Sequence, residues 1–203
     1  PVDGLLGKPE QAIAEQRIEA LKSDNMFWRK HAQRLLVERG KSDISPNVVK
    51  LFDDDFVDSR GLNTTVIHGL WTLHGLGAFA AADSGEATKL LVAAAKHPSA
   101  AVNLAAVQVM PRTDGLPLQL VVAGTFGNPS LGASSFLALA DAPKNEKSAF
   151  MAASAMQVPE NWSDRLVLDA VTAAAAKQEE LFLMYVLRPD VGKSLDDSRP
   201  LQR

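Results

Sequence analysis

Apolar side chains recur along this chain every three or four residues, and helix-breaking residues separate one run from the next. In the first such run, residues 9–22, Ala12, Ile13, Ile18, Ala20 and Leu21 form a mostly apolar stripe. No segment alternates apolar and polar residues over the length of a strand, which argues against a sheet. The pattern therefore predicts a chain built from helices.

The breaks between runs divide the chain into short elements. The sequence predicts helices over 9–22, 25–39, 46–53, 63–79, 85–97, 99–110, 116–126, 131–140, 146–157, 164–177 and 178–187. Gly40 stands where a left-handed residue would end the second of them. Residues 188–203 combine proline, glycine and mixed charge, which predicts an extended tail or linker.

Three of these helices begin at a regular interval. Asn25, Asn63 and Ser99 stand near their starts, at steps of about 37 residues, close to the unit length of HEAT-like repeats. One helix pair cannot bury both of its apolar faces, whereas a neighbouring pair stacked on it covers them. We therefore predict an all-α solenoid of the HEAT type, with about five antiparallel helix pairs over residues 1–187. A compact, non-repeating helical bundle is the alternative.

Composition excludes several function classes. Hydrophobic residues make up 46% of the chain, charged residues 22%, and the net charge of −3 comes from both signs spread along the sequence. No basic block favours nucleic acid, and no apolar run is long enough for a membrane-spanning helix. The absence of cysteine excludes disulfides, thiolate catalysis and covalent c-type haem within this chain. A start at Pro1, without an apolar leader, suggests a processed or shortened chain.

The polar residues form no recognised catalytic or metal-binding pattern. His68 and His74 are six residues apart and do not share a helix face, while His31 and His97 are isolated, so all four are expected to be structural or on the surface. Asp53, Asp54 and Asp55, with Asp58, lack the full calcium-loop pattern and are expected to form a solvated helix end, with a weak ion site as the alternative.

Gly75 and Gly77 could suggest a phosphate-binding loop, but they follow a predicted helix and lack the third glycine of the dinucleotide motif. We expect them to cap that helix. The sequence therefore predicts no catalytic residue, no cofactor and no metal site, and the chain is not expected to be an enzyme.

The candidates for an interaction surface are aromatic and basic. Phe27 is assigned to the apolar stripe of its helix and to the core, with Trp28 and Arg29 turning progressively away from it. Tryptophan and arginine are enriched at interface hot spots. The candidate interface residues are Trp28, Arg29, Arg34, Trp71 and His74. For the two tryptophans the favoured interpretation is packing between repeats, and docking of a neighbouring domain is the alternative.

Two segments resemble a known family. Residues 24–40 read DNMFWRKHAQRLLVERG and residues 67–79 read IHGLWTLHGLGAF. Together they resemble the HEAT-like region of large bacterial multidomain proteins described as membrane-bound dehydrogenases or haem-binding CxxCH proteins. In that family a β-propeller resembling sugar dehydrogenases precedes the helical region and a cytochrome c domain follows it.

The resemblance implies a role without chemistry of its own. This sequence contains neither a CxxCH motif nor a propeller, so no haem or sugar-oxidising site carries over. The resemblance implies a non-catalytic scaffold that connects neighbouring domains of a larger periplasmic or extracellular protein, or that binds another protein. The alternative function is a self-contained enzyme or ligand-binding helical domain with an unrecognised site between helices.

Overall fold

The structure, a computed structural model, describes residues 10–80, 85–113 and 128–187. Within these residues every regular element is helical and none is a strand, which confirms the predicted all-α class. The chain divides into two compact units, Pro1–Val109 and Met110–Arg203. The predicted domain over 1–187 spans both. The predicted helix over 116–126 and the predicted tail over 188–203 lie outside the described residues.

Unit 1 contains all three of the regularly spaced helices. Its elements are α1 (Glu10–Ala20), α2 (Met26–Arg39), the 3-10 turn η2 (Ser42–Ile44), α3 (Ser45–Val49), the 3-10 turn η3 (Lys50–Asp53), α4 (Thr64–Gly75), α5 (Gly85–Ala94) and α6 (Ala100–Val109). The predicted segment 46–53 corresponds to two short elements, α3 and η3. The helix predicted over 63–79 ends early, at Gly75.

Local sequence explains the ends of α2 and α4. The Asn25 side chain accepts a hydrogen bond from the Phe27 N–H at 2.9 Å, and the Asn63 side chain accepts one from the Val66 N–H at 3.0 Å, so each asparagine caps a helix. Gly40 ends α2 with a φ of 67°, as predicted. At the end of α4, Gly77 has a φ of 74° and donates to the His74 carbonyl, so Gly77 forms the predicted cap, whereas Gly75 is the last residue of the helix.

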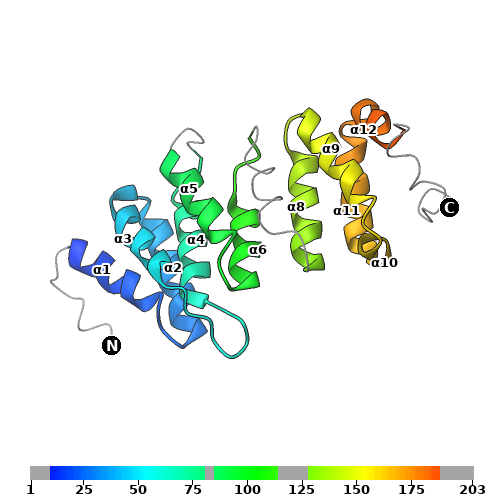
Figure 1. The fold of residues 1–203 in the computed structure, drawn as a ribbon. Coiled ribbons are helices and arrows are strands. Elements are labelled where there is room, and N and C mark those ends of the chain that lie inside the picture. The colour runs from blue at the N-terminus through cyan, green and yellow to red at the C-terminus, as the bar shows by residue number, and fades with distance from the viewer. Residues whose placement is uncertain (1–9, 81–84, 114–127, 188–203) are drawn as a thin grey trace. The chain divides into compact units, whose positions relative to one another are not determined.

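Helices α2, α4 and α6 pack side by side in that order, with α3 beside α4 and α5 beside α6 (Figure 1). Gln33 of α2 contacts His68 of α4, and His74 of α4 contacts the Val109 carbonyl at the end of α6. Each of these two hydrogen bonds joins residues 35 positions apart. The first hydrogen bond joins the middle of α2 to the first half of α4, and the second joins the C-terminal ends of α4 and α6.

The core of unit 1 lies where these helices meet. Its largest fully buried side chains are aliphatic and come from every helix of the row and from the neighbouring elements: Leu21, Leu36, Ile44, Val48, Val66, Leu70, Leu73, Leu91, Val102 and Val107. In α4, Val66, Leu70 and Leu73 are spaced three or four residues apart and form the stripe that the sequence pattern predicts.

Unit 2 is built from smaller side chains. Its helices are α8 (Pro129–Asp141), α9 (Glu146–Ala155), the short α10 (Glu160–Ser163), which the sequence pattern did not predict, α11 (Arg165–Ala176) and α12 (Glu179–Val186). Helix α11 packs closely on α8, and α9 contacts both α11 and α12. Buried alanines such as Ala152, Ala170 and Ala174 share one core cluster with the larger Phe136 and Leu139. Small side chains at these contacts allow the helices to approach closely.

Candidate interaction surface

The first turn of α2 exposes three consecutive large apolar side chains. Met26 is 55% exposed, Phe27 61% and Trp28 50%, and we call these three residues the aromatic cluster. The Phe27 ring packs edge-on against Trp28 at a centroid distance of 5.2 Å and stacks on the His31 ring at 5.4 Å. Adjacent apolar side chains held together at the surface are typical of an interaction site.

The assignment of Phe27 to the core is wrong, and helix geometry explains why. Phe27 and Leu36 are nine residues apart, and at about 100° per residue they point to opposite sides of the helix. Arg29 precedes Leu36 by seven residues, about two full turns, so it shares the buried face with Ala32 and Leu36. The sequence interpretation assigned Phe27 to the core because the side chain is hydrophobic, and did not follow its angular position around the helix axis.

Arg29 is accordingly buried, at 7% exposure, and does not turn away from the core as the sequence pattern suggested. Its side chain reaches back along α2, and Nη1 donates a 2.5 Å hydrogen bond to the Ser23 carbonyl. The buried Nε meets no acceptor in the described structure. Among the described residues no carboxylate lies within ion-pairing distance of this guanidinium.

Arg29 lines an open groove of about 830 Å³ at this end of unit 1, which we call the charged groove. Residues from the end of α1, the start of α2, α3, η3, the following loop and the first turn of α4 surround it. Those used below are Lys22, Asp24, Arg29, Lys50, Asp53, Asp54, Phe56, Asp58, Arg60, Thr64 and Thr65. The lining holds four basic and four acidic side chains, so its formal charges balance.

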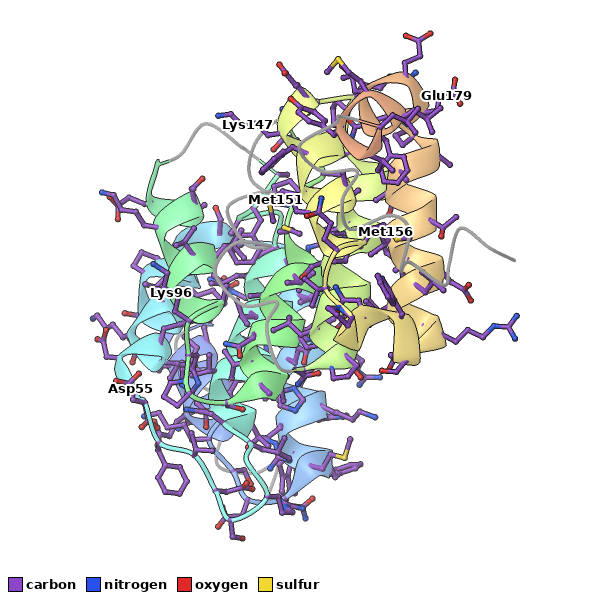
Figure 2. The ribbon with its side chains drawn as sticks, turned by 45° about the vertical axis from the view of Figure 1, so that its right-hand side comes forward. Asp55, Lys96, Lys147, Met151, Met156 and Glu179 are labelled. Carbon is purple, nitrogen blue, oxygen red and sulfur yellow. The ribbon has the colours of Figure 1, made fainter. Side chains whose placement is uncertain are left out.

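Two of the acidic residues organise the loop between η3 and α4. Asp58 accepts hydrogen bonds from the N–H groups of Leu62, at 2.9 Å, and Arg60, at 2.8 Å, and these backbone bonds lower the pKa of its carboxyl group. Asp54 accepts from the Phe56 N–H at 2.9 Å. Asp55 carries its carboxylate outward from the same segment (Figure 2). In the described parts of the chain, no group of three or more histidines and carboxylates is arranged to hold a metal ion.

His97, in the turn between α5 and α6, holds this loop in place through a hydrogen bond to the Asp54 carbonyl. The ring Nδ1 accepts a hydrogen bond from the Ser99 N–H at 2.9 Å, so a neutral ring carries its proton on Nε2, which lies 3.3 Å from the Asp54 carbonyl. The Ser99 hydroxyl donates to the Gly61 carbonyl at 2.7 Å. The structural role expected for His97 fits these contacts.

The remaining predicted interface residues lie away from the groove. Arg34 is exposed on α2 and forms an ion pair with Glu38 at 3.6 Å. Trp71, which is half-buried, packs edge-on against the exposed His74 at a centroid distance of 5.7 Å. His74 lies beside the Val109 carbonyl, with its Nδ1 at 3.1 Å. The structure therefore separates Trp71 and His74, near the end of α4, from Trp28 and Arg29, near the start of α2.

Sequence reasoning also missed residues that line the groove. Lys50, Phe56, Thr64 and Thr65 come from three different segments and carry no motif. The signal available for Arg29 was its helical spacing from Ala32 and Leu36, which places it on the buried face.

Comparisons of this sequence with protein-family models, curated proteins and solved structures found no significant match. None of the described helices is both long and apolar enough to cross a lipid bilayer. The functional argument therefore depends on the aromatic cluster and the charged groove themselves.

Proposed function

We propose that this chain is a non-catalytic interaction module that docks a protein partner at the N-terminal end of α2. The exposed aromatic cluster carries the proposal, because Met26, Phe27 and Trp28 place three large apolar side chains next to one another at the surface. Burying them in a complex would remove apolar surface from water, which is the main favourable term in association. The charged groove, which Asp24 and Arg29 help to line, offers a partner separate polar contacts.

The architecture we propose for the module is a HEAT-like solenoid of about five helix pairs. The side-by-side row of α2, α4 and α6, with hydrogen bonds joining residues 35 positions apart, supports it in unit 1. Stacked helix pairs present extended surfaces that suit protein partners. The family resemblance of residues 24–40 and 67–79 supports a narrower role, as the connector between a propeller dehydrogenase-like domain and a cytochrome c domain in a periplasmic or extracellular protein.

A self-contained enzyme or a ligand-binding domain is the alternative function, and the charged groove is the observation that favours it. A general acid needs a carboxyl group with a raised pKa, whereas the pKa of Asp58 is lowered by hydrogen bonds from its own loop. Asp54 likewise accepts a hydrogen bond from its own loop. The groove therefore supports binding better than catalysis.

Chemical cross-linking tests the interaction role in the full-length protein. Lys22 and Lys30 flank the aromatic cluster and are exposed, so an amine-reactive cross-linker should join them to lysines outside residues 1–203. Replacing Phe27 and Trp28 with glutamine should abolish these cross-links without unfolding the chain. Leu183→Gln with Met184→Gln is the matched control, because these side chains of α12 are 51% and 44% exposed. Cross-links confined to residues 1–203, or equal losses in both double variants, would contradict the proposal.

A further inference from the structure

The guanidinium of Arg29 is a buried cation without a carboxylate partner. Nη1 is held by the Ser23 carbonyl, and the fully buried Nε meets no acceptor. Nη2 forms no hydrogen bond with a described protein atom and, unlike Nε, is not fully buried. A buried charge is costly unless it is paired. Because Arg29 lines the charged groove, an anionic group bound there can supply the missing partner.

The first turn of α4 faces the same groove. Thr64 and Thr65 line it, and neither backbone N–H has a hydrogen-bond partner in the described structure, whereas the Val66 N–H is occupied by Asn63. Free N–H groups at the start of a helix favour an anion. The Arg29 charge also reaches α4, because it contributes, after burial, to the lowered pKa of His68, one turn further along. Arg29 and the first turn of α4 therefore both offer donors to the same groove.

The charges around this position indicate what kind of anion fits. Asp58 forms an ion pair with Arg60 and accepts hydrogen bonds from the backbone of its own loop. Asp24 and Asp53, in contrast, are exposed and form no ion pair among the described residues. The four acidic side chains of the lining offset its four basic ones, so the groove lacks the excess of positive charge that favours a small, doubly charged anion. A peptide that carries one carboxylate and, nearby, a basic side chain complements both the cation of Arg29 and the carboxylates of Asp24 and Asp53. A volume of about 830 Å³ leaves room for several residues.

We propose that Arg29 and the first turn of α4 bind a glutamate or aspartate side chain of a docking protein segment, with a basic residue of that segment directed toward Asp24 and Asp53. This inference rests on the proposed function and names the chemistry of its partner. Hydrogen bonds from a guanidinium and from helix N–H groups to a carboxylate are charge-assisted, and they are the stronger kind.

Nuclear magnetic resonance titration of the whole chain with two peptides tests the site. One peptide is acetyl-Gly-Ser-Glu-Gly-Lys-Gly-amide, and the other has glutamine in place of glutamate. The glutamate peptide should shift the amide signals of Thr64 and Thr65 and the side-chain signal of Arg29, and it should bind at least about tenfold more tightly than the glutamine peptide. Inorganic phosphate, as a third probe, should bind more weakly than the glutamate peptide.

A proline substitution separates binding from folding. Thr64 is the first residue of α4, where proline is well tolerated, so Thr64→Pro removes one proposed donor while the helix remains. It should weaken binding of the glutamate peptide several-fold. Thr64→Ala is the matched control, because it removes the hydroxyl, keeps the N–H and should bind as the wild type does. Arg29→Lys should also weaken binding, since an ammonium lacks the planar fork of the guanidinium.

The outcomes distinguish this site from the docking role. Equal affinity for both peptides, tighter binding of phosphate, or unchanged binding by Thr64→Pro would overturn the carboxylate subsite, while cross-links from Lys22 and Lys30 would still support docking. Selective binding of the glutamate peptide without any such cross-link would support the subsite and contradict the docking role.

Discussion

Gly75 at the end of α4 lies directly against Val37 of α2. A Cβ atom added to Gly75 would be 2.6 Å from Val37 Cγ2 and 2.9 Å from Cγ1, closer than real side chains approach. Valine is stiff at χ1 in a helix, so its methyl groups cannot easily turn away. The absence of a side chain at Gly75 therefore permits the close contact between α2 and α4.

Gly75→Ala should destabilise unit 1 by about 1–3 kcal/mol, the usual range for overpacking. Urea unfolding followed by circular dichroism measures this loss. Adding Val37→Ala should make the alanine at position 75 much less costly, since it removes the methyl groups that clash. Gly85→Ala is the matched control, because a Cβ there meets nothing within 4 Å. Equal effects at positions 75 and 85 would contradict the contact.

Gly40 tests backbone conformation without any clash. Its φ of 67° is unfavourable for other residues, and a Cβ there meets nothing within 4 Å. Gly40→Ala should therefore cost about 1 kcal/mol through the backbone alone, and Gly40→Asn should cost less, because asparagine tolerates the left-handed region. Thermal unfolding of both variants checks the order. An alanine variant as stable as the wild type would contradict the cap.

Asp164 caps α11 in unit 2. Its Oδ1 accepts hydrogen bonds from the N–H groups of Leu166, at 2.9 Å, and Val167, at 3.2 Å. Asp164→Ala should lower the free energy of unfolding by about 1 kcal/mol, whereas Asp164→Asn should keep most of the stability that the cap contributes. Asp169→Asn is the control, because its 3.6 Å ion pair with Arg165 is exposed and should contribute about 0.5 kcal/mol or less. Equal losses at both aspartates, measured by urea unfolding, would contradict the capping role.

Local signals in the sequence predicted the helices well, because caps and turns act over a few residues. Asn25 and Gly40 bound α2 as expected, and Asn63 begins α4. The early end of α4 at Gly75 was harder to predict, because the following residues are still apolar and Phe79 is buried outside the helix. Burial alone does not require helical backbone.

The site was less predictable, because it is assembled from segments distant in sequence. Trp28 is 50% exposed, which fits the interface alternative better than packing between repeats, and Phe27 was placed in the core although it lies on the opposite face. The position of Arg29 follows from helical angle, yet its place in one groove with the start of α4 depends on the packing of α2 against α4. No local pattern encodes that packing.

His68 gives unit 1 a pH dependence that its sequence did not suggest. Burial, followed by the charges of Arg29 and Lys30, lowers the pKa of His68 from 6.5 to about 4, and its Nδ1 lies 2.7 Å from Gln33 Oε1. In the unfolded chain His68 is therefore protonated below about pH 6.5, whereas in the folded chain it stays neutral until about pH 4. Stability due to neutral His68 is fully present above pH 6.5 and decreases as the pH falls toward 4.

The decrease should be about 1–2 kcal/mol, less than the full shift implies, because the partly exposed ring is screened by solvent. His68→Gln should remove this component, so the wild type should lose more stability than the variant between pH 6.5 and 4 in urea unfolding. Carboxylates such as Asp43 and Asp58 also lose stabilising charge at low pH, but they do so in both proteins and cancel in the comparison. Parallel pH profiles, or a His68 ring titrating near pH 6.5 in magnetic resonance spectra, would show that neither burial nor Arg29 perturbs it.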